Sequence, residues 1–227
     1  MLENKLNLTN SLELAREEER LSKTRALELF EDGLIDTFEV GTFKGLRQIH
    51  AHLFQDVYDF AGKTREQNIA KGNFRFAPRM YLPQALEAID KMPESSFDEI
   101  VEKYVEMNVA HPFREGNGRS TRLWLDLILR VRLGVVIDWS LVDKEDYLLA
   151  MERSPVRDTE IKTLLRTALT DRINDRLVYM KGLDASYRYE GYGSYVASEL
   201  SAQQVMEPNE PQTHQDEPAL GGEDPDL

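Results

Sequence analysis

Histidine, glutamate, glycine and arginine stand close together between residues 111 and 122, a combination suited to chemistry on phosphate groups. The two glycines of Gly116-Asn117-Gly118 can adopt backbone angles that other residues avoid, so successive amides can point into one concavity just before a helix. The amino terminus of a helix adds partial positive charge, and phosphate oxygens bind readily there. A structural turn between two helices is the alternative, because Asn-Gly is a common turn dipeptide.

Two arginines follow this turn directly. Arg119 and Arg122 lie three residues apart in the first turn of the predicted helix, so their side chains share one face. Cations at this position oppose the helix dipole, which favours an anionic ligand as large as a triphosphate. Glu115 adds a hard oxygen ligand, and Mg²⁺ characteristically binds one or two carboxylates together with substrate phosphates. A plain salt bridge is the alternative role for this glutamate.

Asn108 and His111 precede the turn, on the apolar face of a helix predicted from about Phe97 to His111. A lone histidine on such a face is usually a satisfied core residue at a helix end. Here the histidine is not alone, because a turn suited to binding anions begins only a few residues later.

The elements that must position these residues are nearly all helices. Helices are predicted from Asn10 to Glu31, from Thr42 through Val57, from about Pro83 to Lys91, from about Phe97 to His111, from Gly118 to Leu133, from Lys144 to Arg153, from Asp158 to Thr170, from Asp171 to Met180 and from Asp184 to Tyr192. The helix that begins at Gly118 is apolar nearly all round and is therefore expected at the centre of the fold. The stretch from Gly62 to Pro78 breaks the helical pattern, and Gln67-Asn68-Ile69 and Phe74-Arg75-Phe76 fit the two strands of a small hairpin. The predicted fold class is all-α, a compact helical domain with one β-hairpin.

Composition limits the kind of protein. Of the 227 residues, 41% are hydrophobic and 30% are charged, and no apolar run is long enough to span a membrane. The amino terminus lacks the pattern of a secretory signal, and the absence of cysteine excludes disulfides and thiolate metal sites. A cytoplasmic protein without membrane contact is expected.

The net charge of −13 is concentrated near the carboxyl terminus. Residues 193–227 hold eight acidic residues and no lysine or arginine, which leaves −5 for residues 1–192. This balance argues against direct nucleic-acid binding, which needs clustered cations. From Ser201 onward the chain is rich in Gln, Pro, Glu, Asp and Gly, so residues 193–227 are expected to form an acidic, disordered tail.

The run from 111 to 122 reads His-Pro-Phe-Arg-Glu-Gly-Asn-Gly-Arg-Ser-Thr-Arg and resembles in full the signature of the Fic family. The resemblance extends over roughly Leu27 to Gly191, so it covers the hairpin and the helices on both sides. It implies a Fic domain at residues 27–192, after an amino-terminal helical segment at residues 1–26. It also implies a protein adenylyltransferase that moves AMP from ATP to Ser, Thr or Tyr hydroxyls of other proteins.

The family's roles can be transferred position by position. The resemblance makes His111 the general base and Glu115 the ligand of Mg²⁺, while Phe113 anchors the loop in the core. The residues implied to contact ATP are Lys71, Asn108, Val109, Ala110, His111, Gly116, Asn117, Gly118, Arg119, Ser120, Thr121, Arg122 and Lys144. For Lys71 and Lys144, an ordinary solvated lysine is the alternative. The hairpin resembles the flap that aligns a target segment by strand-like pairing, with Gln67, Asn68, Ile69 and Ala70 as its edge.

A second pattern lies near the end of the helical region. Ser186-Tyr187-Arg188-Tyr189-Glu190-Gly191 resembles the Ser-x-x-x-Glu-Gly inhibitory motif of Fic proteins, here in a predicted helix at residues 184–192. The resemblance implies that Glu190 pairs with Arg122 and removes the cation that should meet the γ-phosphate. Self-modification at Tyr187 or Tyr192 would add bulk and charge beside Glu190 and release it. A solvated helix end is the alternative.

Several alternatives to AMP transfer stay open. Some relatives carry lysine in place of the second glycine and act as kinases, so Gly118 favours AMP transfer, and divergent members transfer other nucleotides or phosphocholine. Glu190 could also orient water for the removal of AMP from a target. A non-catalytic module that senses ATP is a further alternative, although a sensor needs no general base. The target is a protein with a hydroxyl side chain, and some small bacterial relatives modify topoisomerase subunits. A homo-oligomer is also open, because several relatives assemble.

Overall fold

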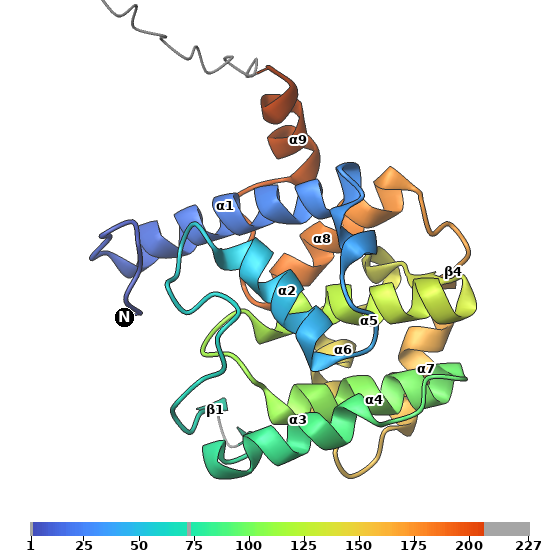
Figure 1. The fold of residues 1–227 in the computed structure, drawn as a ribbon. Helices are drawn as coiled ribbons and strands as arrows, with labels where there is room; N and C mark the ends of the chain where they lie inside the picture. Colours follow the sequence, from blue (N-terminus) through green and yellow to red (C-terminus); the bar gives the residue numbers. More distant parts are fainter. Residues whose placement is uncertain (1, 72–73, 207–227) are drawn as a thin grey trace, which may run out of the picture.

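Helix α5 (Asn117–Leu133) runs through the middle of the molecule, and other helices surround it (Figure 1). The computed structural model describes residues 2–71 and 74–206. Trp124 and Ile128 of α5 are fully buried, and α2, α4 and α8 all pack against this helix. The prediction of an apolar central helix is confirmed, and the fold is helical as the sequence indicates.

The other helices follow in chain order. They are α1 (Ser11–Glu31), α2 (Phe43–Phe54), α3 (Leu82–Asp90), α4 (Phe97–Ala110), α6 (Lys144–Arg153), α7 (Thr159–Thr167), α8 (Arg176–Tyr189) and α9 (Ala197–Met206). Short 3-10 turns lie at Leu34–Thr37, Arg79–Tyr81 and Trp139–Leu141. Side-chain caps start several of these helices where the sequence predicts, because the cap residue accepts a hydrogen bond from a main-chain amide that the helix leaves unpaired. The Thr42 hydroxyl accepts from the Gly45 amide at 3.2 Å, and Ser96 forms a capping box with Glu99.

The hairpin is present; its second strand lies where the sequence predicts it, but its first strand is shifted. Strand β1 (Ala70–Lys71) pairs antiparallel with β2 (Phe74–Arg75), with Ala70 opposite Arg75. The first strand therefore begins after Gln67-Asn68-Ile69, where the sequence pattern placed it. The described residues also contain a second ladder, in which β3 (Val136–Ile137) pairs with β4 (Leu169–Thr170). A two-residue strand carries no alternation, so its pattern could not predict this ladder.

The two helices predicted for residues 171–180 and 184–192 form one helix, α8. Asp175 caps it by accepting from the amides of Leu177 and Val178, and no break occurs at Asp184. The Asp184 carboxylate instead accepts from the Lys23 ammonium at 3.1 Å and from the Ala197 amide at 3.0 Å. Tertiary partners outweigh the local capping tendency of this aspartate.

The amino-terminal and carboxyl-terminal segments both join the main fold. Helix α1 crosses the boundary expected at residue 26 without interruption and packs against α2, α8 and α9 (Figure 1). Helix α9 lies in the segment expected to be disordered, which corrects that prediction for its residues. Ala197 and Leu200 are buried, so this short apolar face offsets part of the entropy of ordering. The rest of the predicted tail, residues 207–227, lies outside the described residues.

Within the described part of the chain, we find no helix whose length and apolar character would let it cross a bilayer.

Candidate active site

A cleft of about 750 Å³ lies over the amino end of α5. This volume is within the range of small-molecule sites, roughly 300–1,000 Å³. The walls come from the hairpin, the end of α4, the turn before α5, helix α6 and the segment after α8. The lining residues are Ile69, Ala70, Phe76, Asn108, His111, Arg114, Glu115, Gly116, Asn117, Gly118, Arg119, Arg122, Tyr147, Leu148, Met151, Glu152, Glu190 and Tyr192.

His111 is the residue that ends helix α4. Its backbone is left-handed, with φ 47° and ψ 63°, an uncommon conformation for a residue other than glycine. Ring atom Nδ1 lies 3.2 Å from the carbonyl oxygen of Asn108. Because a carbonyl can only accept, Nδ1 carries the proton in the neutral ring and Nε2 carries the lone pair. The Phe76 ring stacks on the imidazole with centroids 3.6 Å apart, so the ring plane is set as well.

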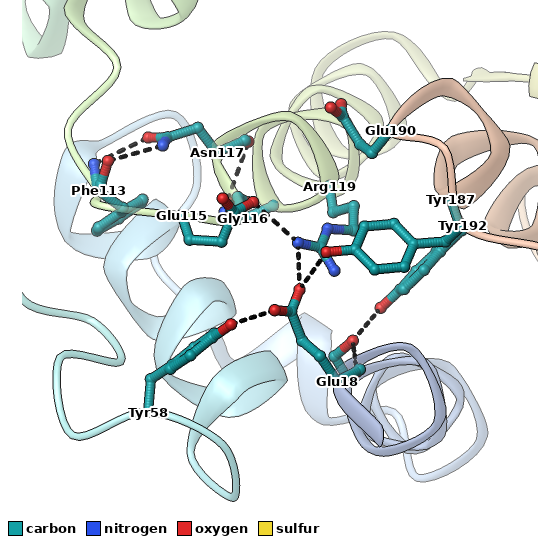
Figure 2. A network of polar contacts seen from close by, with 12 residues as sticks. Glu18, Tyr58, Phe113, Glu115, Gly116, Asn117, Arg119, Tyr187, Glu190 and Tyr192 are labelled. Atoms are coloured by element: carbon teal, nitrogen blue, oxygen red, sulfur yellow. Dashed lines mark hydrogen bonds and ion pairs between the residues drawn. The ribbon is translucent and has the colours of Figure 1, made fainter. Parts of the chain in front are cut away.

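The turn after His111 is shaped by residues packed beneath it. Gly116 has φ 77°, and a Cβ atom there would lie 2.3 Å from the Phe54 ring, so glycine is required twice over. The Asn117 amide group bonds the main chain of Phe113 in both directions at 2.8 Å (Figure 2). Phe113 itself is fully buried and anchors the turn in the core, as the sequence predicts.

His50 supports the same turn from α2. Its Nδ1 accepts from the Gly62 amide at 2.9 Å, so Nε2 carries the proton and donates to the Glu115 carbonyl at 2.8 Å. Burial lowers the pKa of His50 to about 3, which keeps the ring neutral. Sequence reasoning did not select His50, because nothing in the sequence links it to a loop that lies so much later in the chain.

Arg122 is buried against helix α8. Its Nε donates to the Ser186 hydroxyl at 2.7 Å, and Nη2 donates to the Ser186 carbonyl at 2.9 Å and to Glu190 Oε1 at 2.9 Å. Burial alone would lower the pKa of Arg122, but Tyr147 and Glu190 raise it above its ordinary value. The same Glu190 oxygen would lie 2.1 Å from a Cβ atom placed on Gly118. The glutamate therefore lies directly over the turn and not only beside the arginine.

Arg119 is buried on the opposite side, against helix α1. Its Nη2 atom pairs with Glu18 Oε1 at 2.6 Å and with Glu115 Oε1 at 3.2 Å (Figure 2). The guanidinium carbon also lies 4.5 Å from the centroid of the Tyr192 ring. Among the described residues, no hydrogen-bond partner reaches its Nε or Nη1. The sequence carried no signal for Glu18, which is one of three consecutive glutamates on a helix.

Most residues expected to contact ATP line the cleft, but some do not. In the described structure, Val109, Ala110, Ser120 and Thr121 are absent from its lining. The Ser120 and Thr121 hydroxyls donate to the Gly116 and Asn117 carbonyls. Adjacent positions on a helix point in different directions, so a continuous motif cannot lie wholly on one wall.

The two lysines have different outcomes. The Lys144 ammonium donates to the Arg188 carbonyl at 2.9 Å and does not belong to the cleft lining of the described structure, so its assignment to ATP stays a prediction. A cation is favourable there because it lies at the carboxyl end of α8. The side chain of Lys71 lies outside the described part of the chain.

Of the four residues predicted to form the edge of the flap, only the last two line the cleft. Ile69 and Ala70 line the cleft. Asn68 instead accepts from the Arg79 amide at 2.8 Å, and the Gln67 carbonyl accepts from Arg65 at 2.6 Å. Sequence reasoning did not select the cleft residues Phe76, Arg114, Tyr147, Leu148, Met151 and Glu152. Four of these lie on α6, whose ordinary amphipathic pattern gives no sign of a site.

The two tyrosines proposed for self-modification differ in access. Tyr187 is 1% exposed, and its hydroxyl donates to Ser22 at 2.9 Å. Burial raises the pKa of Tyr187 to about 12. Tyr192 lines the cleft and donates to Glu18 at 2.8 Å.

Glu115 is the candidate metal ligand. Its side chain is 41% exposed at the edge of the turn, and its Oε1 accepts from the Gly116 amide at 2.9 Å. In the described part of the chain, no group of three or more acidic or histidine side chains could hold a metal ion by itself. One carboxylate beside an anion-binding turn suits Mg²⁺, which takes its other ligands from substrate phosphates and water.

Known proteins resemble this chain in sequence. The model of the Fic/DOC family matches residues 42–129. The protein adenylyltransferase VbhT of Bartonella schoenbuchensis is 30% identical over 194 residues, which are 80% of this chain but 40% of that protein. The probable protein adenylyltransferase y4lH of Sinorhizobium fredii is 33% identical over 166 residues, which are 68% of this chain and 83% of that protein. The chain thus spans well under half of the first relative and most of the second.

Solved structures share the fold. The structure of BepC from Bartonella tribocorum with bound AMPPNP has a TM-score of 0.61 at 18% identity, and covers 75% of this chain and 92% of that one. The Fic domain of a Bartonella quintana effector with bound ADP has a TM-score of 0.62 at 22% identity, and covers 75% and 91%. At these identities the likeness establishes the fold alone.

Proposed function

Because this chain belongs to the Fic/DOC family, we propose that it is a protein adenylyltransferase, which moves AMP from ATP to a hydroxyl side chain of another protein. One observation carries the proposal. A histidine whose Nδ1 is held by the Asn108 carbonyl opens onto the same cleft as the Gly116–Gly118 turn and two buried arginines. The sequence relatives of this chain support the proposal by name: VbhT is called a protein adenylyltransferase and y4lH a probable protein adenylyltransferase.

His111 acts as the general base in this proposal. Its Nε2 takes the proton from the target hydroxyl, and the oxygen of that hydroxyl forms a bond to the α-phosphorus of ATP. The bond between the α-phosphorus and the oxygen that bridges to the β-phosphate breaks. Pyrophosphate leaves with that electron pair, and AMP stays on the target.

Charge neutralisation is the second requirement of phosphoryl-type transfer. The amides at Gly116 to Gly118, at the start of α5, would bind phosphate oxygens, and Arg119 and Arg122 would face the outgoing pyrophosphate. Glu115 would hold Mg²⁺, which supplies further positive charge at the phosphates when it is bound.

We propose further that Glu190 keeps the enzyme inactive at rest. Its carboxylate pairs with Arg122 at 2.9 Å, so this arginine is not available to a terminal phosphate. The same carboxylate lies over Gly118, in the space that the phosphate would fill. Helix α8 ends at Tyr189 with Glu190 as its cap residue, and Gly191, with φ 90°, follows directly. A carboxylate at a helix end can leave without unfolding the core.

Self-modification would be one means of release. Tyr192 is the better acceptor of the two tyrosines, because it lines the cleft whereas the Tyr187 hydroxyl is buried against Ser22. AMP on Tyr192 would remove its hydrogen bond to Glu18 and add bulk near Glu190.

The proposal is tested with ATP labelled at the α-phosphate and, separately, at the γ-phosphate. The Glu190→Gly variant should place more α-label on protein than the unaltered chain, and the added His111→Ala change should abolish it. Mass spectrometry of the products locates the modified side chains, including Tyr192.

Other results would assign another activity. Label from the γ-phosphate on protein would indicate a kinase, and nucleotide binding without label on protein would indicate a sensor of ATP. Loss of AMP from a pre-modified target would indicate removal of AMP in the same cleft.

A further inference from the structure

Arg65 connects the hairpin to the end of helix α4, although it lies outside the motif at residues 111–122. Arg65 precedes the hairpin in sequence and is buried, with 4% of the residue exposed. Its guanidinium donates to main-chain carbonyls of three separate segments. The acceptors are Gln67 at 2.6 Å, Ala77 at 2.5 Å, Ala110 at 3.1 Å and His111 at 2.7 Å.

These acceptors are the points where the hairpin meets helix α4. Gln67 precedes strand β1 and Ala77 follows strand β2, so the guanidinium bonds both ends of the hairpin. Ala110 and His111 are the end of α4, where carbonyls lack partners within the helix and the dipole is negative. Two main-chain bonds strengthen the junction: the Arg65 amide donates to Pro112 at 2.8 Å, and the Ala77 amide donates to Val109 at 3.0 Å.

His111 needs such support. A residue other than glycine costs free energy in the left-handed conformation and keeps it only where the surroundings impose it. The Arg65 Nε bond to the His111 carbonyl acts directly on the peptide whose orientation defines that conformation. Imidazole placement therefore depends on this contact as well as on the Asn108 carbonyl.

We propose that Arg65 is a positioning residue that sets the general base and the hairpin in one geometry. The hairpin is the element expected to align the target segment, so its distance from His111 decides whether the target hydroxyl meets Nε2. Arg65 determines that distance because one planar group is bonded to both elements. The expected effect on kcat rests on the proposed adenylyl transfer. The role of Arg65 in holding the hairpin against helix α4 does not depend on that function.

Arginine is required by the geometry. The guanidinium carries five N–H donors in a rigid plane, which can reach acceptors on several sides. A lysine ammonium at the same place would keep the charge but offers donors from one atom only. Arg65→Lys therefore preserves the charge and most of the side-chain volume, and removes the simultaneous bonding.

The first test uses the Glu190→Gly background, in which transfer is measurable. Arg65→Lys should lower kcat by about 100-fold, the effect of misplacing a reacting group by about 1 Å, while the Kd for AMPPNP changes by less than about threefold. Arg47 supplies the matched control, because it is an exposed residue whose guanidinium donates to a single carbonyl, that of Gly62, at 3.0 Å. Arg47→Lys should leave kcat within about twofold.

Chemical rescue separates positioning from general stability. In Arg65→Ala, added guanidinium ion should restore part of kcat, because it can enter the vacated site and bond the same carbonyls. The His111→Ala variant should gain nothing from guanidinium. Unchanged kcat in Arg65→Lys, or parallel losses of kcat and AMPPNP affinity, would overturn the proposal.

Hydrogen exchange tests the same inference without any activity. In Arg65→Lys, the Ala77 amide should exchange at least about tenfold faster, because its bond to Val109 depends on the junction. Arg47→Lys should not change this rate. If no variant transfers label but this exchange pattern holds, the adenylyl transfer fails and the positioning role of Arg65 stands; unchanged exchange in Arg65→Lys would refute that role.

Discussion

Arg119 and Arg122 lie one helical turn apart and are both buried, yet their carboxylate partners are held in different ways. Glu18 stands in the middle of α1, its side chain is 4% exposed, and the hydroxyls of Tyr58 and Tyr192 also donate to it (Figure 2). Glu190 follows the last residue of α8, and its side chain is 21% exposed. We call the ion pair of Arg119 with Glu18 the Arg119 pair, and that of Arg122 with Glu190 the Arg122 pair.

The difference indicates which pair can change during function. Moving Glu18 would leave the buried Arg119 with only the half-exposed Glu115 as a carboxylate partner and would break two tyrosine contacts, which is costly. Moving Glu190 would leave Arg122 with the Ser186 hydroxyl, the Ser186 carbonyl and the Tyr147 hydroxyl as acceptors. Opening the Arg122 pair should therefore cost less free energy than opening the Arg119 pair, which fits the proposed release of Glu190.

The largest expected effect is on stability. Glu18→Ala should lower the free energy of unfolding by about 3 kcal/mol, the lower end for a broken buried pair, because Glu115 still faces Arg119. Glu190→Ala should lower it by about 1 kcal/mol or less, since Arg122 keeps three acceptors. Urea unfolding followed by tryptophan fluorescence measures both. Equal losses in the two variants would remove the distinction between the pairs.

A smaller effect concerns the pH dependence of stability, which should include a contribution from His50, the residue that donates to the Glu115 carbonyl. His50 has a pKa of about 3 in the folded protein and about 6.5 when unfolded, so below pH 6.5 the unfolded state binds a proton that the folded state does not. Its contribution to stability is complete above pH 6.5 and is lost as the pH falls. The loss should reach about 2 kcal/mol by pH 5.

Urea unfolding at pH 7, 6 and 5 checks this, with His50→Gln as the control. Glutamine can still donate to the Glu115 carbonyl but does not titrate, so the pH dependence of this variant should be shallower by about one proton. An identical slope in the two proteins would contradict the assignment.

The smallest expected effect is on nucleotide affinity. Glu190→Gln should lower the Kd for AMPPNP by about tenfold, or 1.4 kcal/mol, because Arg122 becomes available to the terminal phosphate. Glu18→Gln should not lower it, since the Arg119 pair costs more free energy to open. Isothermal titration calorimetry compares the two variants at equal salt. Tighter binding in Glu18→Gln would show that both pairs compete with nucleotide.

Local features of the site could be predicted because their causes are local. The turn at Gly116 to Gly118, the Thr42 cap and the apolar pattern of α5 each depend on residues a few positions apart. The ion pair between Glu190 and Arg122 is the exception, since it spans much of the chain. It was foreseen only through the resemblance of two separate motifs to one family.

The sequence by itself determined the helical fold class, the place of His111 at the end of a helix and the glycine turn that follows it, because periodicity, caps and glycine conformations act over short distances. The tertiary structure alone decided that Glu18 pairs with Arg119, that Arg65 bonds the hairpin to His111, and that Lys144 bonds a helix end instead of lining the cleft. Each of these contacts joins residues far apart in the chain. Their partners are selected by burial, since a buried charge or amide must find whatever group the packed core places within reach.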